Sequence, residues 1–123
     1  MSEPDPSIDP AVIANLRTLN SGDNDDFLRE IVGLFFIDTP VRLADLERSL
    51  AAGDAATFQR AAHSIKGSSA SLGARLLRAL AEEIEGRAQK EGLAGLGPMV
   101  RSLKAEFAVV KTALEKIVSR PPA

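Results

Sequence analysis

Residues 54–73 read DAATFQRAAHSIKGSSASLG, and they contain the start, the body and the end of one helix. Asp54 can accept hydrogen bonds from the free backbone N–H groups of a first turn, and Gly73 is the residue type that most often ends a helix. Apolar or small side chains recur between them at the spacing of one helix face: Phe58, Ala62, Ile65, Ser69 and Leu72. The spacing therefore predicts an amphipathic helix that packs one face into a core.

Helical patterns continue on the N-terminal side of this segment. Asp9-Pro10 predicts the start of a short helix, which ends near residues 20–22, because Asp caps helices well and Pro is tolerated at the first helical position. A longer helical segment begins within residues 23–25 and ends at Gly53. Pro40 lies inside it and removes one backbone donor, so we expect a kink or a break there.

Two more helices are predicted on the C-terminal side, one that ends before Gly92 and one that follows a break over residues 95–98. Their apolar positions are Leu76, Leu77, Leu80 and Ile84 in the first, and Val100, Leu103, Phe107, Val110, Leu114 and Ile117 in the second. Short Gly-containing loops favour antiparallel neighbours. The expected fold is all-α: an up-down-up-down four-helix bundle, with the short N-terminal helix covering one end. We expect this domain over residues 9–119, after a flexible lead-in at residues 1–8 and before a tail at residues 120–123.

Composition excludes several classes of function. The chain has 123 residues, 45% of them apolar, and a formal net charge of -2. It has no Cys, which excludes disulfides and thiolate metal sites. The near-neutral charge argues against nucleic acid as a partner, because phosphate backbones require clustered Lys and Arg. We find no secretory leader and no apolar run of membrane-spanning length, so the expectation is a monomeric cytoplasmic protein with no membrane partner.

His63 is the one histidine of the chain. On a helix of 3.6 residues per turn it lies about 140° from Phe58, so it is expected to face solvent. Gly67 lies one turn further along the same face, and Ala56 and Ala70 lie two turns away on either side. A Gly inside a helix costs about 1 kcal/mol relative to Ala. We infer that Gly67 keeps the approach to the imidazole open.

These features suit a phosphoryl carrier. A neutral imidazole is a nucleophile at pH 7 and can attack an activated phosphoryl group. Lys66 can supply positive charge to the same patch, and Gln59 can supply a hydrogen bond. The sequence shows no nucleotide or metal site, so the prediction is a carrier without cofactors of its own and not an enzyme.

The stretch from His63 to Ala74, HSIKGSSASLGA, resembles the motif of histidine-containing phosphotransfer (HPt) domains, which is H-x-x-K-G followed by small residues, an apolar residue and Gly. The resemblance extends over about residues 8–118. It includes residues 26–30, the Asp38-Thr39-Pro40 step, and residues 51–54 before the histidine helix.

This resemblance implies a four-helix bundle that exchanges phosphate with response-regulator receiver domains, including that of a hybrid histidine kinase. The receiver would supply Mg²⁺. Carried over by position, His63 is the phosphorylated nucleophile, Lys66 stabilises the phosphate and Gly67 keeps the site open. Ser68 and Ser69 are secondary candidates, for which a plain packing role is at least as favoured. Some relatives place a further polar side chain on the next helix, but none of the candidates here is assigned: Glu82, Glu85, Arg87 and Gln89.

Three other functions fit the sequence less well. A helical protein-interaction bundle without phosphorylation is disfavoured because His63, Lys66 and Gly67 are all present. A sensor histidine kinase would need a nucleotide-binding domain, and no Gly-rich nucleotide loop occurs. A bundle metalloprotein lacks ligands, because one His without a suitable His or Glu partner toward the core cannot build a di-iron site.

Overall fold

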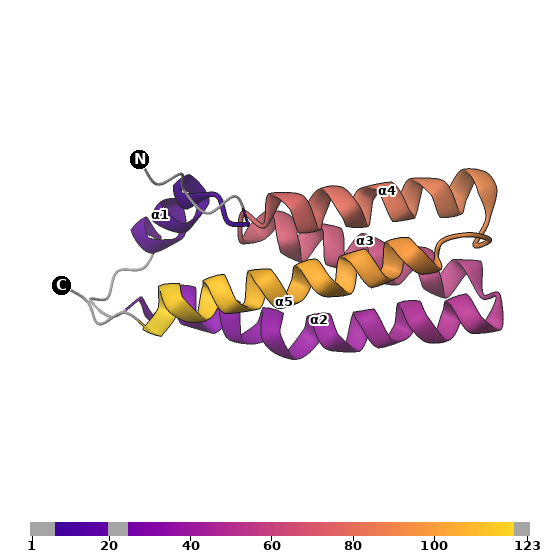
Figure 1. Ribbon diagram of the computed structural model, residues 1–123. Helices are drawn as coiled ribbons and strands as arrows, with labels where there is room; N and C mark the ends of the chain where they lie inside the picture. The colour runs from indigo at the N-terminus through magenta and orange to yellow at the C-terminus, as the bar shows by residue number, and fades with distance from the viewer. Residues whose placement is uncertain (1–6, 20–24, 120–123) are drawn as a thin grey trace.

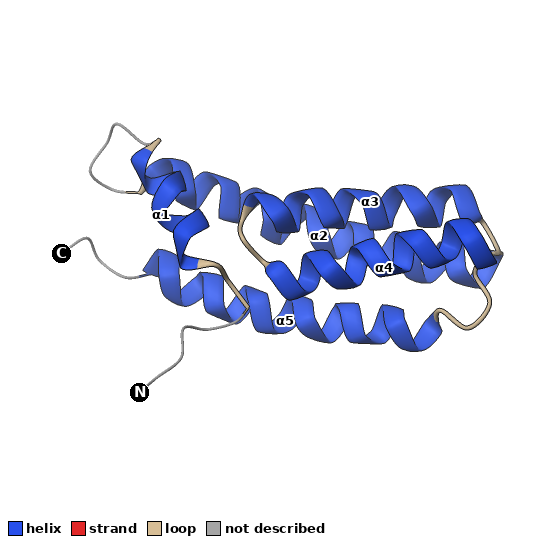
Figure 2. Cartoon of the chain, turned by 90° about the horizontal axis from the view of Figure 1, so that it is seen from above, coloured by secondary structure: helices blue, strands red, loops and turns tan. Residues whose placement is uncertain are grey.

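The computed structural model describes residues 7–19 and 25–119, and all regular structure in these ranges is helical. The helices are α1 (Pro10–Thr18), α2 (Asp26–Ala52), α3 (Ala55–Ser71), α4 (Arg75–Glu91) and α5 (Gly97–Ser119). The four long helices form an antiparallel bundle in which α2 and α4 each pack against both α3 and α5 (Figures 1 and 2). The predicted fold class is confirmed. None of the helices in the described ranges combines the length and apolarity needed to cross a membrane.

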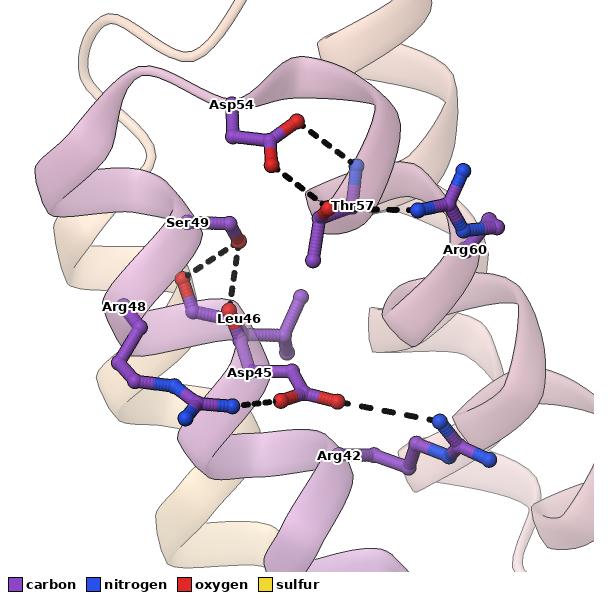
Figure 3. Close-up of polar contacts among 8 residues, drawn as sticks. All are labelled: Arg42, Asp45, Leu46, Arg48, Ser49, Asp54, Thr57 and Arg60. Carbon is purple, nitrogen blue, oxygen red and sulfur yellow. Dashed lines mark hydrogen bonds and ion pairs between the residues drawn. The ribbon is translucent and has the colours of Figure 1, made fainter.

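The turn between α2 and α3 follows from two adjacent residues, Gly53 and Asp54, and Ser49 adds a hydrogen bond in the helix before them. Gly53 adopts φ +71°, a left-handed conformation that ends α2. Asp54 then caps α3, accepting hydrogen bonds from the backbone N–H of Thr57 at 3.2 Å and from its hydroxyl at 2.7 Å (Figure 3). Ser49 donates its hydroxyl to the carbonyl of Asp45 in the last turns of α2. The start of the histidine helix is thus fixed by local hydrogen bonds.

The opposite end of α3 is closed by Gly73 and covered by α1. The backbone N–H of Asp9 donates to the carbonyl of Gly73 at 2.8 Å. Gly73 has φ +73°, and a Cβ added there would lie 2.9 Å from the Cβ of Val12. Only glycine fits this turn, because both the backbone angle and the close approach of α1 exclude a side chain. Figure 1 shows α1 at this end of the bundle.

Ser7 and Ile8 are buried, and Ile8 belongs to the hydrophobic core. The structure thus buries the last two residues of the lead-in that was expected over residues 1–8, because Ile8 carries an apolar side chain. Residues 1–6, and the tail predicted at residues 120–123, lie outside the described residues.

Two further details differ from expectation. α2 continues through Pro40 as one helix, so the break that was one of the two expected outcomes does not occur. Phe35, Thr39 and Leu43 form one buried face across the proline, and this packing holds the helix together where one backbone hydrogen bond is lost. Leu76 is 51% exposed, because the buried face of α4 is centred on Leu77 and lies a quarter-turn away.

Candidate functional site

α3 presents His63 to solvent. Its side chain is 67% exposed, while Phe58, Ala62 and Ile65 of the same helix are fully buried. The amphipathic pattern explains this division, because the residues that face the core fix the rotation of the helix. The predicted outward orientation of His63 is confirmed.

Glu85 of α4 joins His63 and Lys66 of α3 into one cluster. One carboxylate oxygen, Oε2, lies 2.9 Å from Nδ1 of His63, and the other, Oε1, lies 2.8 Å from Nζ of Lys66. Glu85 is only 18% exposed and Lys66 28%, so the two charged groups are largely covered. The three side chains come from adjacent antiparallel helices, which places them at the same level of the bundle.

The contact with Glu85 selects the tautomer of His63. An ionised carboxylate only accepts hydrogen bonds, so Nδ1 must carry the hydrogen in this contact. In the neutral ring the free lone pair is then on Nε2. The cluster therefore prepares Nε2 as the nucleophilic atom.

The surroundings of Glu85 shift the pKa of its carboxyl group. Partial burial raises the pKa of Glu85, but hydrogen bonds from Lys66 and His63 act in the opposite direction and outweigh it, so the pKa lies below its usual value. The carboxylate is consequently ionised at neutral pH and available to accept from both neighbours.

The flank of His63 is open, as predicted. Gly67 is exposed, and a Cβ added to it would meet no heavy atom within 4 Å. Ala56 and Ala70 on the same face are also exposed. The side chains around the imidazole are therefore short enough for a bulky group to approach.

Other predicted site residues are not brought to His63. Ser68 donates its hydroxyl within α3, to the carbonyls of Ser64 and Ile65. Ser69 is fully buried, so it cannot touch a group that arrives from solvent. Among the described contacts, no hydrogen bond joins Gln59 to His63.

Glu85 is one of the four residues of α4 to which the sequence assigned no role. A carboxylate repels phosphate, but it can also orient an imidazole. Of the other candidates on α4, Glu82 pairs with Arg78, and Arg87 lies 3.8 Å from Glu83. The sequence does contain a sign of this contact. His63 and Glu85 both lie about three helical turns from Gly73, one before it and one after it, so a tight antiparallel connection at Gly73 brings them to the same level.

A groove runs between α2 and α3 next to this site. It has a volume of about 480 Å³ and is lined from α2 by Ile31, Leu34, Phe35, Ile37 and Asp38, and from α3 by Ser68, Ser71 and Leu72. Its α3 residues follow Gly67 within the next turn and a half of the helix, so the groove begins on the C-terminal side of the open flank of His63. Three exposed apolar side chains, which we call the α2 stripe, follow its outer edge: Leu34, Ile37 and Val41.

Within residues 7–19 and 25–119, no three His, Cys, Asp or Glu side chains gather closely enough to hold a metal ion.

Comparison with known proteins identifies relatives of this chain. It is 33% identical over 78 residues to Multistep phosphorelay regulator 1 of Schizosaccharomyces pombe, an alignment that spans 63% of this chain and 26% of that protein. It is 25% identical over 103 residues to Histidine-containing phosphotransfer protein 2 of Arabidopsis thaliana, over 81% of this chain and 66% of that protein. The chain thus matches about a quarter of the first relative and slightly less than two thirds of the second.

Solved structures have the same fold. The crystal structure of histidine-containing phosphotransfer protein B from Pseudomonas aeruginosa matches with a TM-score of 0.85 and 30% identity, covering 94% of this chain and 96% of that one. The HPT domain of a sensor hybrid histidine kinase from Shewanella matches with a TM-score of 0.76 over 96% of this chain and 98% of that one; at 19% identity this likeness supports the fold alone. Residues 30–118 match the family of Hpt domains. The chain therefore belongs to the Hpt domain family.

Proposed function

We propose that this chain is a phosphorelay intermediate, which accepts a phosphoryl group on His63 from the phospho-Asp of one receiver domain and passes it to another. The observation that carries the proposal is the exposed imidazole whose Nδ1 is bound to Glu85 while the flank at Gly67 is open. Two relatives whose names refer to a phosphorelay and to histidine-containing phosphotransfer support the same function.

The transfer uses the lone pair on Nε2. This atom forms a bond to phosphorus while the bond from phosphorus to the aspartyl oxygen of the receiver breaks, and the electron pair of that bond leaves with the receiver carboxylate. The imidazole gains positive charge, and its proton stays on Nδ1, hydrogen-bonded to Glu85. Transfer to a second receiver reverses these steps.

The remaining roles in the site follow from the same geometry. Lys66 stabilises the phosphoryl group by charge, and Gly67 leaves room for it. Ser68, Ser69 and Gln59 have no direct role in this proposal. We propose further that the chain is a carrier and not an enzyme, and that the receiver supplies the Mg²⁺. Action as a cytoplasmic monomer stays a prediction.

The receiver is expected to dock on the α2 stripe and the adjoining groove. Leu34 is 61% exposed, Ile37 72% and Val41 54%, which makes this the main concentration of large exposed apolar side chains on the long helices. Clustered exposed apolar groups next to a functional residue are typical of a protein-interaction surface. A receiver bound there would cover the part of α3 that lies on the C-terminal side of His63 and lines the groove.

The proposal is tested by mixing the purified chain with a panel of receiver domains labelled with radioactive acetyl phosphate. Label should pass to the wild-type chain and not to His63→Ala, while circular dichroism shows the same helical content for both. The adduct should be labile to acid and stable to base, as a phosphoramidate is. Wild-type chain that binds receivers but takes no label would instead support an interaction bundle without phosphorylation, and equal labelling of His63→Ala would exclude His63 as the carrier.

A further inference from the structure

Lys66 already has a partner before any phosphoryl group arrives. Its ammonium lies 2.8 Å from Oε1 of Glu85, and both side chains are largely covered by the protein. An ion pair that is partly shielded from water is stronger than a fully exposed one. The ammonium group of Lys66 is therefore already paired in the unphosphorylated chain.

A phosphoryl group on His63 would bring a second anion to this cation. It carries a charge between about -1.5 and -2, as phosphate monoesters do near neutral pH. Lys66 lies one turn after His63, on the neighbouring part of the same helix, so the ammonium is within reach of both positions. The net free energy by which Lys66 stabilises the phosphorylated site is its interaction free energy with the phosphoryl group minus the interaction free energy that it loses with Glu85.

We propose, resting on the function proposed above, that Glu85 competes with the phosphohistidine for Lys66 and thereby limits how strongly Lys66 holds the phosphoryl group on His63. The exchange breaks no covalent bond: a hydrogen bond from Nζ of Lys66 moves from Oε1 of Glu85 to a phosphoryl oxygen. A relay intermediate must release the group it receives, and a carboxylate that offers Lys66 another partner favours release.

Replacing Glu85 alone would not isolate this effect. Glu85 also accepts from Nδ1 of His63, and this contact favours the positive charge that the ring gains on phosphorylation. A Glu85→Gln variant changes both interactions at once. A double-mutant cycle with Lys66 removes the contribution of the ring, because that contribution is common to variants with and without Lys66.

The cycle uses the wild-type chain, Lys66→Ala, Glu85→Gln and the double variant. The measured quantity is the equilibrium constant for exchange with one receiver domain that exchanges phosphate with the wild type. It is approached from both directions, with either the receiver phosphorylated by acetyl phosphate or the Hpt chain phosphorylated by phosphoramidate. Lys66→Ala should lower this equilibrium constant, written toward the phosphorylated Hpt chain, by about twofold in the wild-type background and by about fivefold in the Glu85→Gln background.

A matched control is available on the same helix. Glu83→Gln is the same substitution two residues earlier in α4, where the side chain is half exposed and pairs with Arg87. The effect of Lys66→Ala should be unchanged in that background. Lys66→Met repeats the cycle with the aliphatic part of the side chain kept, so that lost packing is separated from lost charge.

Equal effects of Lys66→Ala in the wild-type and Glu85→Gln backgrounds would overturn the competition and leave the relay function intact. A wild-type chain that exchanges no phosphate with any receiver would overturn the relay function itself. If Glu85→Gln slows exchange, the equilibrium constant is unaffected by the rate, because both directions must converge on the same value.

Discussion

Two of the grooves beside α2 have the same volume, about 480 Å³, but they carry different side chains. The groove between α2 and α5 is lined by three charged residues among apolar ones, and Lys104 crosses it to Glu47 at 3.4 Å. Lys111 lies in the same groove, 5.9 Å from the ring centre of Phe36. The groove between α2 and α3 has one charged residue, Asp38, and is edged by the α2 stripe.

The volume of a groove therefore does not identify a docking surface in this molecule. Charged side chains of the chain itself cover the α2–α5 groove, and a partner that entered it would have to displace them. The α2–α3 groove has exposed apolar edges and adjoins Gly67, so a partner that covers it removes apolar surface from water. Only the second arrangement combines a favourable surface with the reactive histidine.

The largest effect is expected from a charge placed on the α2 stripe. Ile37→Asp should slow phosphoryl transfer from a receiver at least about tenfold, because a carboxylate would be buried at the centre of the contact. Initial transfer rates at sub-saturating receiver concentration measure this effect. Val109→Asp is the matched control: Val109 is 50% exposed on α5, so the same change there should leave transfer at the wild-type rate. Equal rates for both variants would mean that the α2 stripe is not the surface on which the receiver docks.

A second prediction concerns the open flank of His63. Gly67→Ala should stabilise the fold by about 1 kcal/mol, because an added Cβ meets nothing and Ala favours the helix. Gly67→Gln should also fold, yet slow transfer several-fold, since the longer side chain occupies the approach to the imidazole. Thermal melting and transfer rates are compared with Gly33→Gln, at another helical glycine with open space. A Gly67→Gln chain that melts at or above the wild-type temperature and transfers at the wild-type rate would show that access is not limited there.

A third prediction concerns Asp54, which should contribute to the stability of the fold but not to the binding of a receiver. Its pKa is lowered by hydrogen bonds from the side chain and backbone of Thr57 (Figure 3), so its contribution to stability is present above the ordinary value of 3.8. That contribution is lost as the pH falls through the lower folded value. Asp54→Ala should therefore melt a few degrees below the wild type at pH 7, and the difference should shrink in strong acid. Transfer at a temperature where both chains are folded should be unchanged; slower transfer would mean that the cap also shapes the site.

The smallest effect is expected in the α2–α5 groove. Lys104→Ala removes an ion pair whose two partners are more than half exposed, so the loss of stability should be about 0.5 kcal/mol or less. Transfer should be unchanged. If this variant bound receivers more tightly than the wild type, the α2–α5 groove would be able to bind a receiver once its charged side chains are removed.

The sequence predicted the helices and the exposed histidine because these depend on local signals. Asp54 and Gly73 bound α3 through backbone geometry, and the period of apolar residues sets which face is outward. The role of Glu85 was not predicted, because it depends on the rotation of α4 against α3. The sequence left both a kink and a break open at Pro40, since the buried face that keeps α2 continuous is a property of the packed bundle.

The hydrogen bond from Asp9 to Gly73 has a consequence for the order of folding. α3 and α4 are joined by a turn of three residues, whereas α1 must close a long loop before it reaches that turn. Local contacts form first when loop closure is costly, so α1 is expected to dock after the helical hairpin has formed. It should also be the first element to detach, with backbone amides that exchange with solvent faster than those of α3. Because His63, Lys66 and Glu85 lie within that hairpin, their cluster would persist while the end of the bundle opens and closes.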